Sequence, residues 1–453
     1  MPTLQAELSA IIVAKKLNEG AILYKEVWAS ISPALAVVYW FLYQFFEDNI
    51  SAYQIIASLL VLWQALTFNQ LLVNRRILQE NTLIPALLYI LLMNLFIDFY
   101  SLSAPLLANT FLLLAIKYIF LQLNEKRKNS TVFEIGVYLG IASLFYLPVI
   151  LLVAVPILAF LIATSTPLRD YLIMFFSLLF TLFIVFLVFY VNGIEYHLYH
   201  SFFKSLFMFE FSWLVSWWQV FLLYLLSVFI CVFLLFTPNK FNRYNNYQNR
   251  CSNVMFLWLF VSLAVPLLAN NISPSSFMIT IPALVFLLSH YFLDTKSKLL
   301  TELGFLMWAG STFFLHYDFL YSLRQDFQHT PIIQANQLLV KSLTNPAITQ
   351  NKRVLVIGDD LSYYQKASLA TPYLDYNLSR EHFENLDHYQ TVVAVYENFR
   401  TDLPDVIIDQ KQIMPQILEA VPLLAREYEL LGASVKPRIY VKKFYQSKQQ
   451  SSS

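Results

Sequence analysis

Two histidines lie three residues apart in a short polar stretch between long apolar segments. On a helix, His197 and His200 would share one face, where their imidazoles could bind a divalent metal ion or a phosphate. Glu195 precedes them and adds a carboxylate to the same stretch. The stretch is also rich in tyrosine and phenylalanine, so an aromatic belt at a membrane–water interface is the alternative interpretation.

A second polar group lies near the N-terminus. The spacing of apolar residues over 8–17 predicts an amphipathic helix, which we expect to lie on the outer membrane surface. Glu7 falls in its first turn, where the helix dipole favours a carboxylate. A glycine ends the helix, and the adjacent polar residues Tyr24, Lys25 and Glu26 follow.

The composition indicates the solvent that surrounds these residues. Of 453 residues, 58% are hydrophobic and 13% are charged, and the mean hydropathy is +0.56. These values exclude a water-soluble globule and predict a polytopic helical membrane protein. Lys and Arg number 30 against 29 Asp and Glu, so no basic field attracts nucleic acid. Two cysteines provide neither a disulfide framework nor a zinc quartet.

Apolar runs between charged loops predict about ten membrane-spanning helices, so the fold class is an all-α polytopic membrane protein. The spans fall within 51–323 and follow a juxtamembrane segment, 1–50. We expect them at roughly 52–73, 83–99, 103–122, 131–146, 148–164, 171–192, 214–236, 252–270, 275–293 and 303–321.

The distribution of basic residues predicts the orientation. Alternate loops carry clusters of Lys and Arg, whereas the loops between them carry almost none. The positive-inside rule therefore places the basic loops in the cytoplasm and both ends of the chain outside, in the periplasm of a diderm bacterium. The basic residues are Arg75, Arg76, Lys126, Arg127, Lys128, Arg169, Lys240, Arg243, Arg250, Lys296 and Lys298.

An external N-terminus without a translocation signal predicts a further apolar segment upstream of Met1. The apolar run 34–46 is short for a span and rich in Tyr and Trp, which indicates an interfacial or re-entrant helix. The alternative is that 31–46 crosses the bilayer and inverts the topology, which would place the basic loops outside.

From about Arg324 the charge rises, and 324–445 reads as a small extracytoplasmic α/β domain. Short runs rich in β-branched residues predict strands, and helical spacing over 412–431 predicts a helix. The predicted strands are 353–358, 391–396, 404–409 and 438–442. The acids after Gly358 fit a solvated turn at a strand end better than a phosphate site. The polar tail 446–453 is predicted to be disordered.

The stretch 6–35 resembles the first external loop of the GT-C superfamily of integral-membrane glycosyltransferases, whose donors are polyprenyl-phosphate-linked sugars. In that superfamily an acid begins a juxtamembrane helix, and a glycine, a Tyr-Arg-Asp motif and a Pro-Pro-Leu turn follow. The matching positions here are Glu7, Gly20, Tyr24-Lys25-Glu26-Val27 and Ser32-Pro33-Ala34-Leu35.

The likeness continues beyond this loop. The run 73–76, with two arginines, is similar to a Gly-Arg-Arg at the cytoplasmic end of the next span, and 138–144 resembles a later helix start. The resemblance covers most of the chain in layout, with its motifs concentrated in about 30 residues. The whole chain is most similar to a family of bacterial multi-pass membrane proteins, and that likeness supplies no activity.

The GT-C resemblance implies a mechanism. Glu7 accepts the proton from an acceptor hydroxyl, or orients it, as that oxygen attacks the anomeric carbon of the donor and the lipid phosphate leaves. Lys25 or a divalent metal stabilises the departing charge, and Tyr24 and Glu26 are further candidates for substrate binding. The alternative role for Glu7 is to cap the helix start.

One motif of the superfamily is absent. Many members carry a second acid in the next external loop, where this chain has Ser103-Ala104-Pro105-Leu106. Asp98 is the nearest acid and becomes a candidate substrate-binding residue, although an ordinary loop acid would occupy the same kind of position.

These observations predict a membrane glycosyltransferase that acts at the outer face of the bacterial inner membrane. Its partners would be the lipid bilayer, a polyprenyl-phosphate-linked sugar, and an acceptor that is an envelope glycan, lipid or protein. The alternative is a GT-C-like scaffold for envelope assembly that has lost catalysis. A transporter is less favoured, because the spans show no internal repeat and almost no charge.

Overall fold

The chain forms two compact units in the computed structural model. One, which we call the α/β unit, contains 1–50, 192–204 and 337–453, and the other, the helical unit, contains 51–191 and 205–336. The structure describes residues 2–78, 80–124, 129–163, 166–204, 212–235, 245–294, 298–324, 332, 334–335, 337–343, 346–431 and 437–443. The predicted tail 446–453 and the basic residues Lys126, Arg127, Lys128, Lys240, Arg243 and Lys296 lie outside these ranges.

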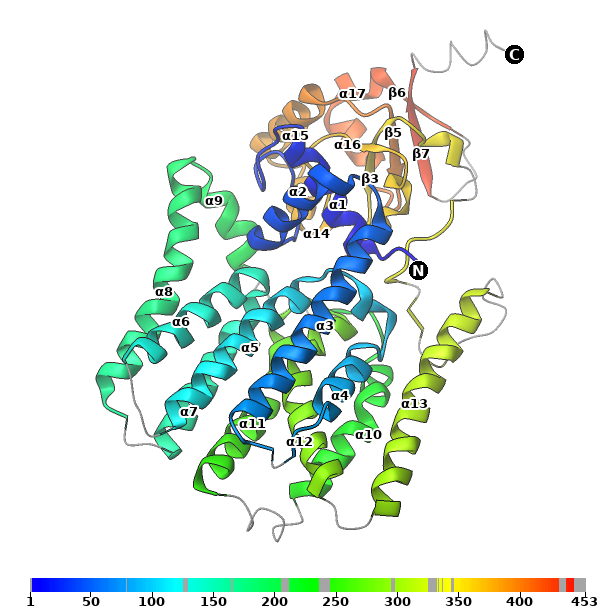
Figure 1. Ribbon diagram of the computed structural model, residues 1–453. Helices are drawn as coiled ribbons and strands as arrows, with labels where there is room; N and C mark the ends of the chain where they lie inside the picture. Colours follow the sequence, from blue (N-terminus) through cyan, green and yellow to red (C-terminus); the bar gives the residue numbers. More distant parts are fainter. Residues whose placement is uncertain are drawn as a thin grey trace. The chain divides into compact units, whose positions relative to one another are not determined.

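The helical unit is a bundle of long and short apolar helices (Figure 1). Its α-helices are α3 (Ile50–Asn74), α4 (Ile84–Met93), α5 (Ala104–Leu123), α6 (Asn129–Phe145), α7 (Ala154–Ala163), α8 (Leu168–Val191), α10 (Trp217–Leu235), α11 (Asn246–Ala264), α12 (Ile281–Asp294) and α13 (Lys298–Arg324). Shorter helical turns are η1 (Ile97–Tyr100), η2 (Leu147–Val153), η6 (Val265–Leu268) and η7 (Pro274–Thr280), and β1 (Ser212–Trp213) pairs with β2 (Asn271–Ile272).

Within the described residues, 5 helices are long and apolar enough to cross a membrane. They are Ile50–Asn74, Ala104–Leu123, Leu168–Val191, Asn246–Leu268 and Pro274–Leu293, and each matches one predicted span. The predicted count of ten is not confirmed. Over the predicted span 83–99, for example, α4 has 10 residues and rises about 15 Å, half of a hydrocarbon core. The chain then bends at Asn94 and forms η1.

Two glycines allow α6 to pack closely against α8. A Cβ added at Gly136 would lie 1.9 Å from Ser177 Oγ and 2.2 Å from the Met174 carbonyl oxygen. One turn later, a Cβ at Gly140 would lie 2.8 Å from Thr181 Cβ. Small residues four apart let two helix backbones approach in this way in membrane proteins.

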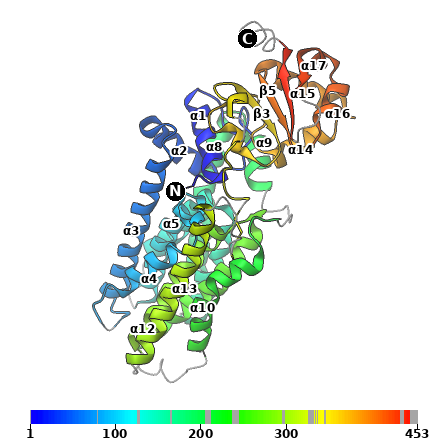
Figure 2. The same ribbon diagram turned by 90° about the vertical axis from the view of Figure 1, so that its right-hand side faces the viewer.

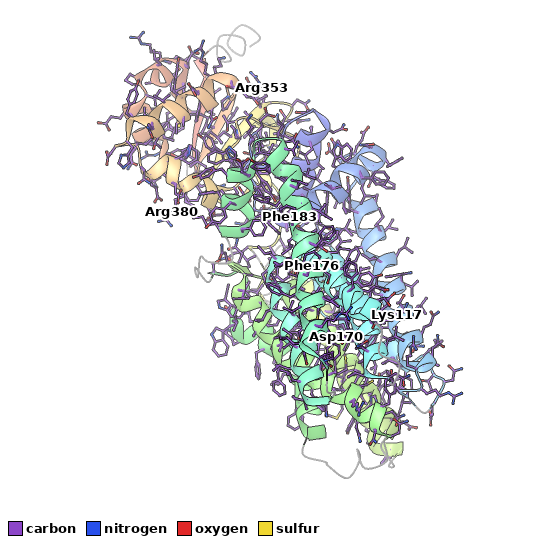
Figure 3. All side chains as sticks on the ribbon, turned by 90° about the vertical axis from the view of Figure 1, so that its left-hand side faces the viewer. Lys117, Asp170, Phe176, Phe183, Arg353 and Arg380 are labelled. Carbon is purple, nitrogen blue, oxygen red and sulfur yellow. The ribbon has the colours of Figure 1, made fainter. Side chains whose placement is uncertain are left out.

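The opposite side of α8 is apolar and exposed. Figure 3 shows Phe176 and Phe183 along this helix, and their side chains are 63% and 55% exposed. Exposed phenylalanines over two turns are expected where a helix faces lipid rather than water.

The α/β unit contains a five-stranded sheet in the order β4-β3-β5-β7-β6. Figure 2 shows two of its strands, β3 and β5. The strands are β3 (Arg353–Ile357), β4 (Ser368–Leu369), β5 (Val406–Asp409), β6 (Tyr428–Leu430) and β7 (Arg438–Lys442). β3 runs parallel to β4 and β5, and β7 runs antiparallel to β5 and β6. The predicted strands 353–358, 404–409 and 438–442 are thus confirmed.

Helices cover one face of this sheet. Leu355 and Ile407 are paired in register, and both join a core cluster to which every one of these helices contributes. The helices are α14 (Tyr376–Glu384), α15 (Tyr389–Thr401), α16 (Met414–Ala420) and α17 (Pro422–Glu427). The single helix predicted for 412–431 is wrong in extent, because Pro422 starts a new helix and β6 follows it.

The predicted strand 391–396 is also wrong, because these residues form part of α15. Val395 and Phe399, four residues apart, are both fully buried, and Val392 packs against the same core. The apolar residues therefore repeat with the period of a helix, although valines favour strands locally.

The N-terminal segment is part of the α/β unit. α1 (Gln5–Asn18) packs against α2 (Pro33–Phe46), η9 (Leu361–Tyr364) and β4. Its apolar face, including Ile11, Val13 and Ala14, is covered by protein. The expectation that this face lies on a membrane surface is therefore wrong, because other segments of the α/β unit cover it. The sequence alone could not reveal these segments as its partners. Val37, Phe41 and Phe45 on α2 are exposed.

Candidate functional site

Three segments of the α/β unit that are distant in the sequence line an open cavity of about 560 Å³. Its lining comes from 16–28, from 196–201 and from 371–402. Five of the candidate residues chosen from the sequence line it, namely Tyr24, Lys25, Glu26, His197 and His200. The fold thus brings together two polar groups that the sequence could only identify separately.

A turn at 22–27 builds the N-terminal wall. Tyr24 has a left-handed backbone, φ 67°, and its buried hydroxyl donates a 2.6 Å hydrogen bond to the Ile31 carbonyl oxygen. The Glu26 carboxylate accepts the Ile22 N–H at 2.8 Å, and both Glu26 and the preceding Lys25 are exposed. Burial raises the pKa of Tyr24 far above its ordinary value, so this phenol stays protonated.

A second part of the lining comes from the loop before α14. The Trp28 N–H donates to the Pro372 carbonyl oxygen at 2.7 Å, and the Asp375 N–H donates to the Trp28 carbonyl oxygen at 2.9 Å. Thr371, which also lines the cavity, has φ 66°. A β-branched residue with this backbone is strained, and strained residues are concentrated at functional sites.

Two lining residues, His200 and Glu381, belong to an ion-pair cluster. His197 lies in α9 (Glu195–Leu198), and His200 lies in the π-helical turn η3 (Tyr199–Phe203). The His200 Nε2 lies 3.3 Å from Glu381 Oε2, and the Lys204 Nζ donates to Glu381 Oε1 at 3.0 Å. The hydrogen bond from Lys204 is the main reason why the pKa of Glu381 is below its ordinary value.

Two other histidines in the lining, His197 and His382, are less easily protonated than a free imidazole. Burial lowers the pKa of His197, and the positive charge of Lys25 lowers it further. Burial likewise lowers the pKa of His382, which also lines the cavity. At neutral pH both imidazoles are therefore uncharged and able to accept or donate hydrogen bonds.

The cluster does not fit a metal at His200 Nε2. The Lys204 ammonium lies 3.2 Å from this nitrogen, where it would repel a cation. In the part of the chain that the structure describes, no group of three or more His, Cys, Asp and Glu side chains has a geometry that could hold a metal.

Two candidates lie away from this cavity lining. Glu7 is 2% exposed, and its carboxylate accepts the Leu4 N–H at 3.3 Å at the start of α1. Asp98 belongs to the helical unit, where its buried carboxylate accepts the Ser275 N–H at 2.9 Å and so connects η1 to η7. The role of either residue in a reaction stays a prediction.

Sequence reasoning missed the contribution of the C-terminal region to this site. Glu381, His382, Glu397 and Asn398 line the cavity from α14 and α15. One signal could have indicated α15, namely the helical period of its valines, but nothing in the sequence pairs it with the N-terminal turn.

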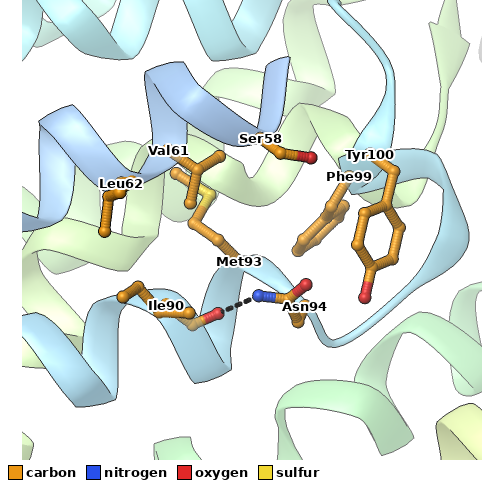
Figure 4. Close-up of a pocket in the computed structure, with 8 residues that line it drawn as sticks. All are labelled: Ser58, Val61, Leu62, Ile90, Met93, Asn94, Phe99 and Tyr100. Atoms are coloured by element: carbon orange, nitrogen blue, oxygen red, sulfur yellow. Dashed lines mark hydrogen bonds between the residues drawn. The ribbon is translucent and has the colours of Figure 1, made fainter. Parts of the chain in front are cut away.

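The helical unit has a smaller cavity of about 170 Å³ between α3, α4 and η1 (Figure 4). Its lining is mainly apolar, with Ser58, Asn94 and Tyr100 as the polar members. Asn94 Nδ2 donates to the Ile90 carbonyl oxygen at 2.5 Å, so one donor of this side-chain amide is already bonded at the C-terminal end of α4. This lining suits an apolar group better than a sugar.

No protein-family model matches the sequence, and no curated protein matches it. The fold is similar to that of ArnT from Cupriavidus metallidurans in the apo state, with TM-score 0.50, 11% identity and coverage of 97% of this chain and 93% of that chain. ArnT bound to undecaprenyl phosphate gives TM-score 0.49, 12% identity and coverage of 97% and 94%. At this identity the comparison shows that the chain shares the overall fold of ArnT, as the predicted layout implies.

Proposed function

We propose that this protein is a membrane glycosyltransferase that transfers a sugar from a polyprenyl-phosphate donor to an envelope acceptor. The reaction takes place at the outer face of the bacterial inner membrane, where the α/β unit lies. The observation that carries the proposal is the cavity that gathers Lys25, Glu26 and two histidines from separate segments. The shared fold adds support, because ArnT is a protein that binds undecaprenyl phosphate.

The chemistry is a displacement at the anomeric carbon. An acceptor hydroxyl oxygen forms a bond to this carbon, and the bond from the carbon to the donor phosphate oxygen breaks. The polyprenyl phosphate leaves with the electron pair, and Lys25 stabilises the negative charge as a flexible point charge. The hydroxyl proton passes to a carboxylate, a transfer that contributes about 10²–10⁴-fold to the rate.

Two carboxylates compete for the role of base. The GT-C resemblance implies Glu7, whereas Glu26 is the N-terminal carboxylate that lines the cavity. Glu26 lies next to Lys25 in the sequence and is exposed, so it can reach a bound substrate. The position of Glu26 therefore supports it as the base, and direct comparison of the two residues decides the assignment.

The test uses purified full-length protein in lipid nanodiscs. A polyprenyl-phosphate-linked sugar with a radiolabel is incubated with envelope extract, and transferred label and released polyprenyl phosphate are both measured. We expect Lys25→Ala to slow transfer at least about tenfold, because the leaving charge loses its partner. Lys366→Ala is the matched control, since Lys366 is an exposed lysine of the same unit. Transfer at equal rates in both variants would remove Lys25 from the mechanism.

A further inference from the structure

Thr371 combines two unfavourable features at the cavity. It is 4% exposed, its backbone has φ 66°, and it lines the cavity directly. Within the described part of the chain, its Oγ1 has no hydrogen-bond partner. A buried hydroxyl without a partner is costly, and a β-branched residue at positive φ is rare.

The surrounding chain holds Thr371 in this conformation. On its N-terminal side, the Ala370 N–H donates to the Val354 carbonyl oxygen at 2.9 Å and so extends the pairing of β4 with β3. On its C-terminal side, Pro372 and Asp375 are hydrogen-bonded to the backbone of Trp28. Thr371 is therefore fixed between two paired segments, with its hydroxyl left for another group.

A fixed aromatic ring lies in the same lining. The half-buried Trp28 makes edge contacts with Tyr373, at 5.2 Å between centroids, and with His382, at 4.7 Å. Its Nε1 donates to the Lys25 carbonyl oxygen at 3.2 Å. Asn398 Nδ2 donates to the Tyr373 hydroxyl at 2.7 Å, which fixes Tyr373 next to the Trp28 ring.

The charges in the lining define which ligands are favoured. The lining contains two lysines, Lys16 and Lys25, and four carboxylates. The carboxylates are Glu26, Glu381, Glu397 and Asp402. Ion pairs neutralise two of these carboxylates, Asp402 with Lys16 at 3.7 Å and Glu381 with Lys204 at 3.0 Å. When Lys25 holds the donor phosphate, Glu26 and Glu397 repel a second anion, so the lining favours an acceptor with hydroxyl groups and no negative charge.

We propose that Thr371 and Trp28 form a saccharide subsite that binds the acceptor through a sugar unit without negative charge. The Thr371 hydroxyl hydrogen-bonds a sugar hydroxyl, and the Trp28 ring packs against the apolar face of the sugar ring. This inference deepens the proposed function, and it rests on that function for the reaction in which the bound sugar takes part.

The test is saturation-transfer NMR on the full-length protein in nanodiscs, with methyl β-glucoside as the neutral probe and methyl β-glucuronide as the anionic probe. We expect magnetic saturation to pass from the protein to the neutral glycoside, and we expect the glucuronide to bind at least about fivefold more weakly. Thr371→Val keeps the β-branched shape and removes the hydroxyl, so it should weaken binding of the neutral glycoside at least about tenfold. Thr371→Ser keeps the hydroxyl and should stay within about threefold.

The melting temperature separates binding from a structural role. Thr371→Val should leave it unchanged or raised, because the variant loses a buried hydroxyl that has no partner among the described residues. A lowered melting temperature, equal glycoside binding by Thr371→Val, or stronger binding of the glucuronide would each overturn the subsite. Equal binding is also the result expected if only a water satisfies this hydroxyl.

Transfer assays distinguish this failure from a failure of the proposed function. Sugar transfer with the same acceptor KM in wild type and Thr371→Val would refute the subsite and leave the function standing. Glycoside binding that depends on Thr371, without transfer from any polyprenyl-phosphate donor, would refute the function and leave the subsite standing.

Discussion

Tyr24 and Thr371, from opposite ends of the chain, both have left-handed backbones and both line the same cavity. Neither is a glycine, so each conformation costs free energy, on the order of 1–3 kcal/mol per residue. The hydrogen bond between the Trp28 N–H and the Pro372 carbonyl oxygen joins the two loops. The rest of the α/β unit therefore stabilises a cavity wall that neither loop would adopt alone.

The two candidate bases respond differently to loss of charge. Glu26→Gln keeps an oxygen that can accept the Ile22 N–H, so we expect normal folding and a loss of turnover of about 10²–10⁴-fold. Glu7→Gln removes a charge from the start of α1, so we expect a loss of about 0.5–1 kcal/mol in unfolding free energy and little change in turnover. Initial rates and chemical unfolding check both. The reverse pattern would assign the base to Glu7.

The contacts of Glu381 predict an acid-dependent loss of stability. Its pKa is below the ordinary 4.5 because Lys204 hydrogen-bonds to the carboxylate, so the folded state binds this proton less readily than the unfolded state. The stabilisation is complete above about pH 5 and disappears as the pH falls through the folded-state pKa. Melting curves between pH 3 and 7 measure it.

Glu381→Gln supplies the comparison for that series. The variant should melt at a lower temperature than wild type near pH 7, and the difference should shrink below about pH 4.5. Glu419→Gln, which changes an exposed carboxylate on α16, is the control. A difference that stays constant down to pH 3 would mean that the carboxylate of Glu381 is not held by Lys204.

The contact between α6 and α8 predicts a strong glycine effect. Gly136→Ala places a methyl group where Ser177 Oγ and a backbone oxygen already lie, so we expect a destabilisation of several kcal/mol or a low folded yield. Gly310→Ala, in α13, has open space around the new methyl group and should be neutral or stabilising by about 0.5–1 kcal/mol. Folded yield and melting temperature in detergent check the pair. Equal behaviour would show that the helices separate easily.

The fold class and the N-terminal part of the site could be predicted because their signals are local. Long apolar runs identify α3, α5 and α8, and adjacent polar residues identify Tyr24, Lys25 and Glu26. The short helices α4 and α7 could not be separated from full spans, because composition alone does not show where a helix bends.

The C-terminal half of the site could not be predicted for a different reason. Glu381 and Asn398 meet Lys25 and Trp28 through long-range pairing of loops, such as the isolated bridge between Trp28 and Tyr373. No periodicity in either segment encodes that pairing. Thr371 has no local signal either, since its strain and burial exist only in the folded chain.

The α/β unit is assembled from residues 1–50, 192–204 and 337–453, which sets an order of events during synthesis. α1 leaves the ribosome before η9 and β4, which cover its apolar face and are made after the whole helical unit. At a synthesis rate of about 5–20 residues per second, α1 precedes these partners in the nascent chain by on the order of tens of seconds. Throughout that interval, a chaperone or the insertion machinery has to shield it.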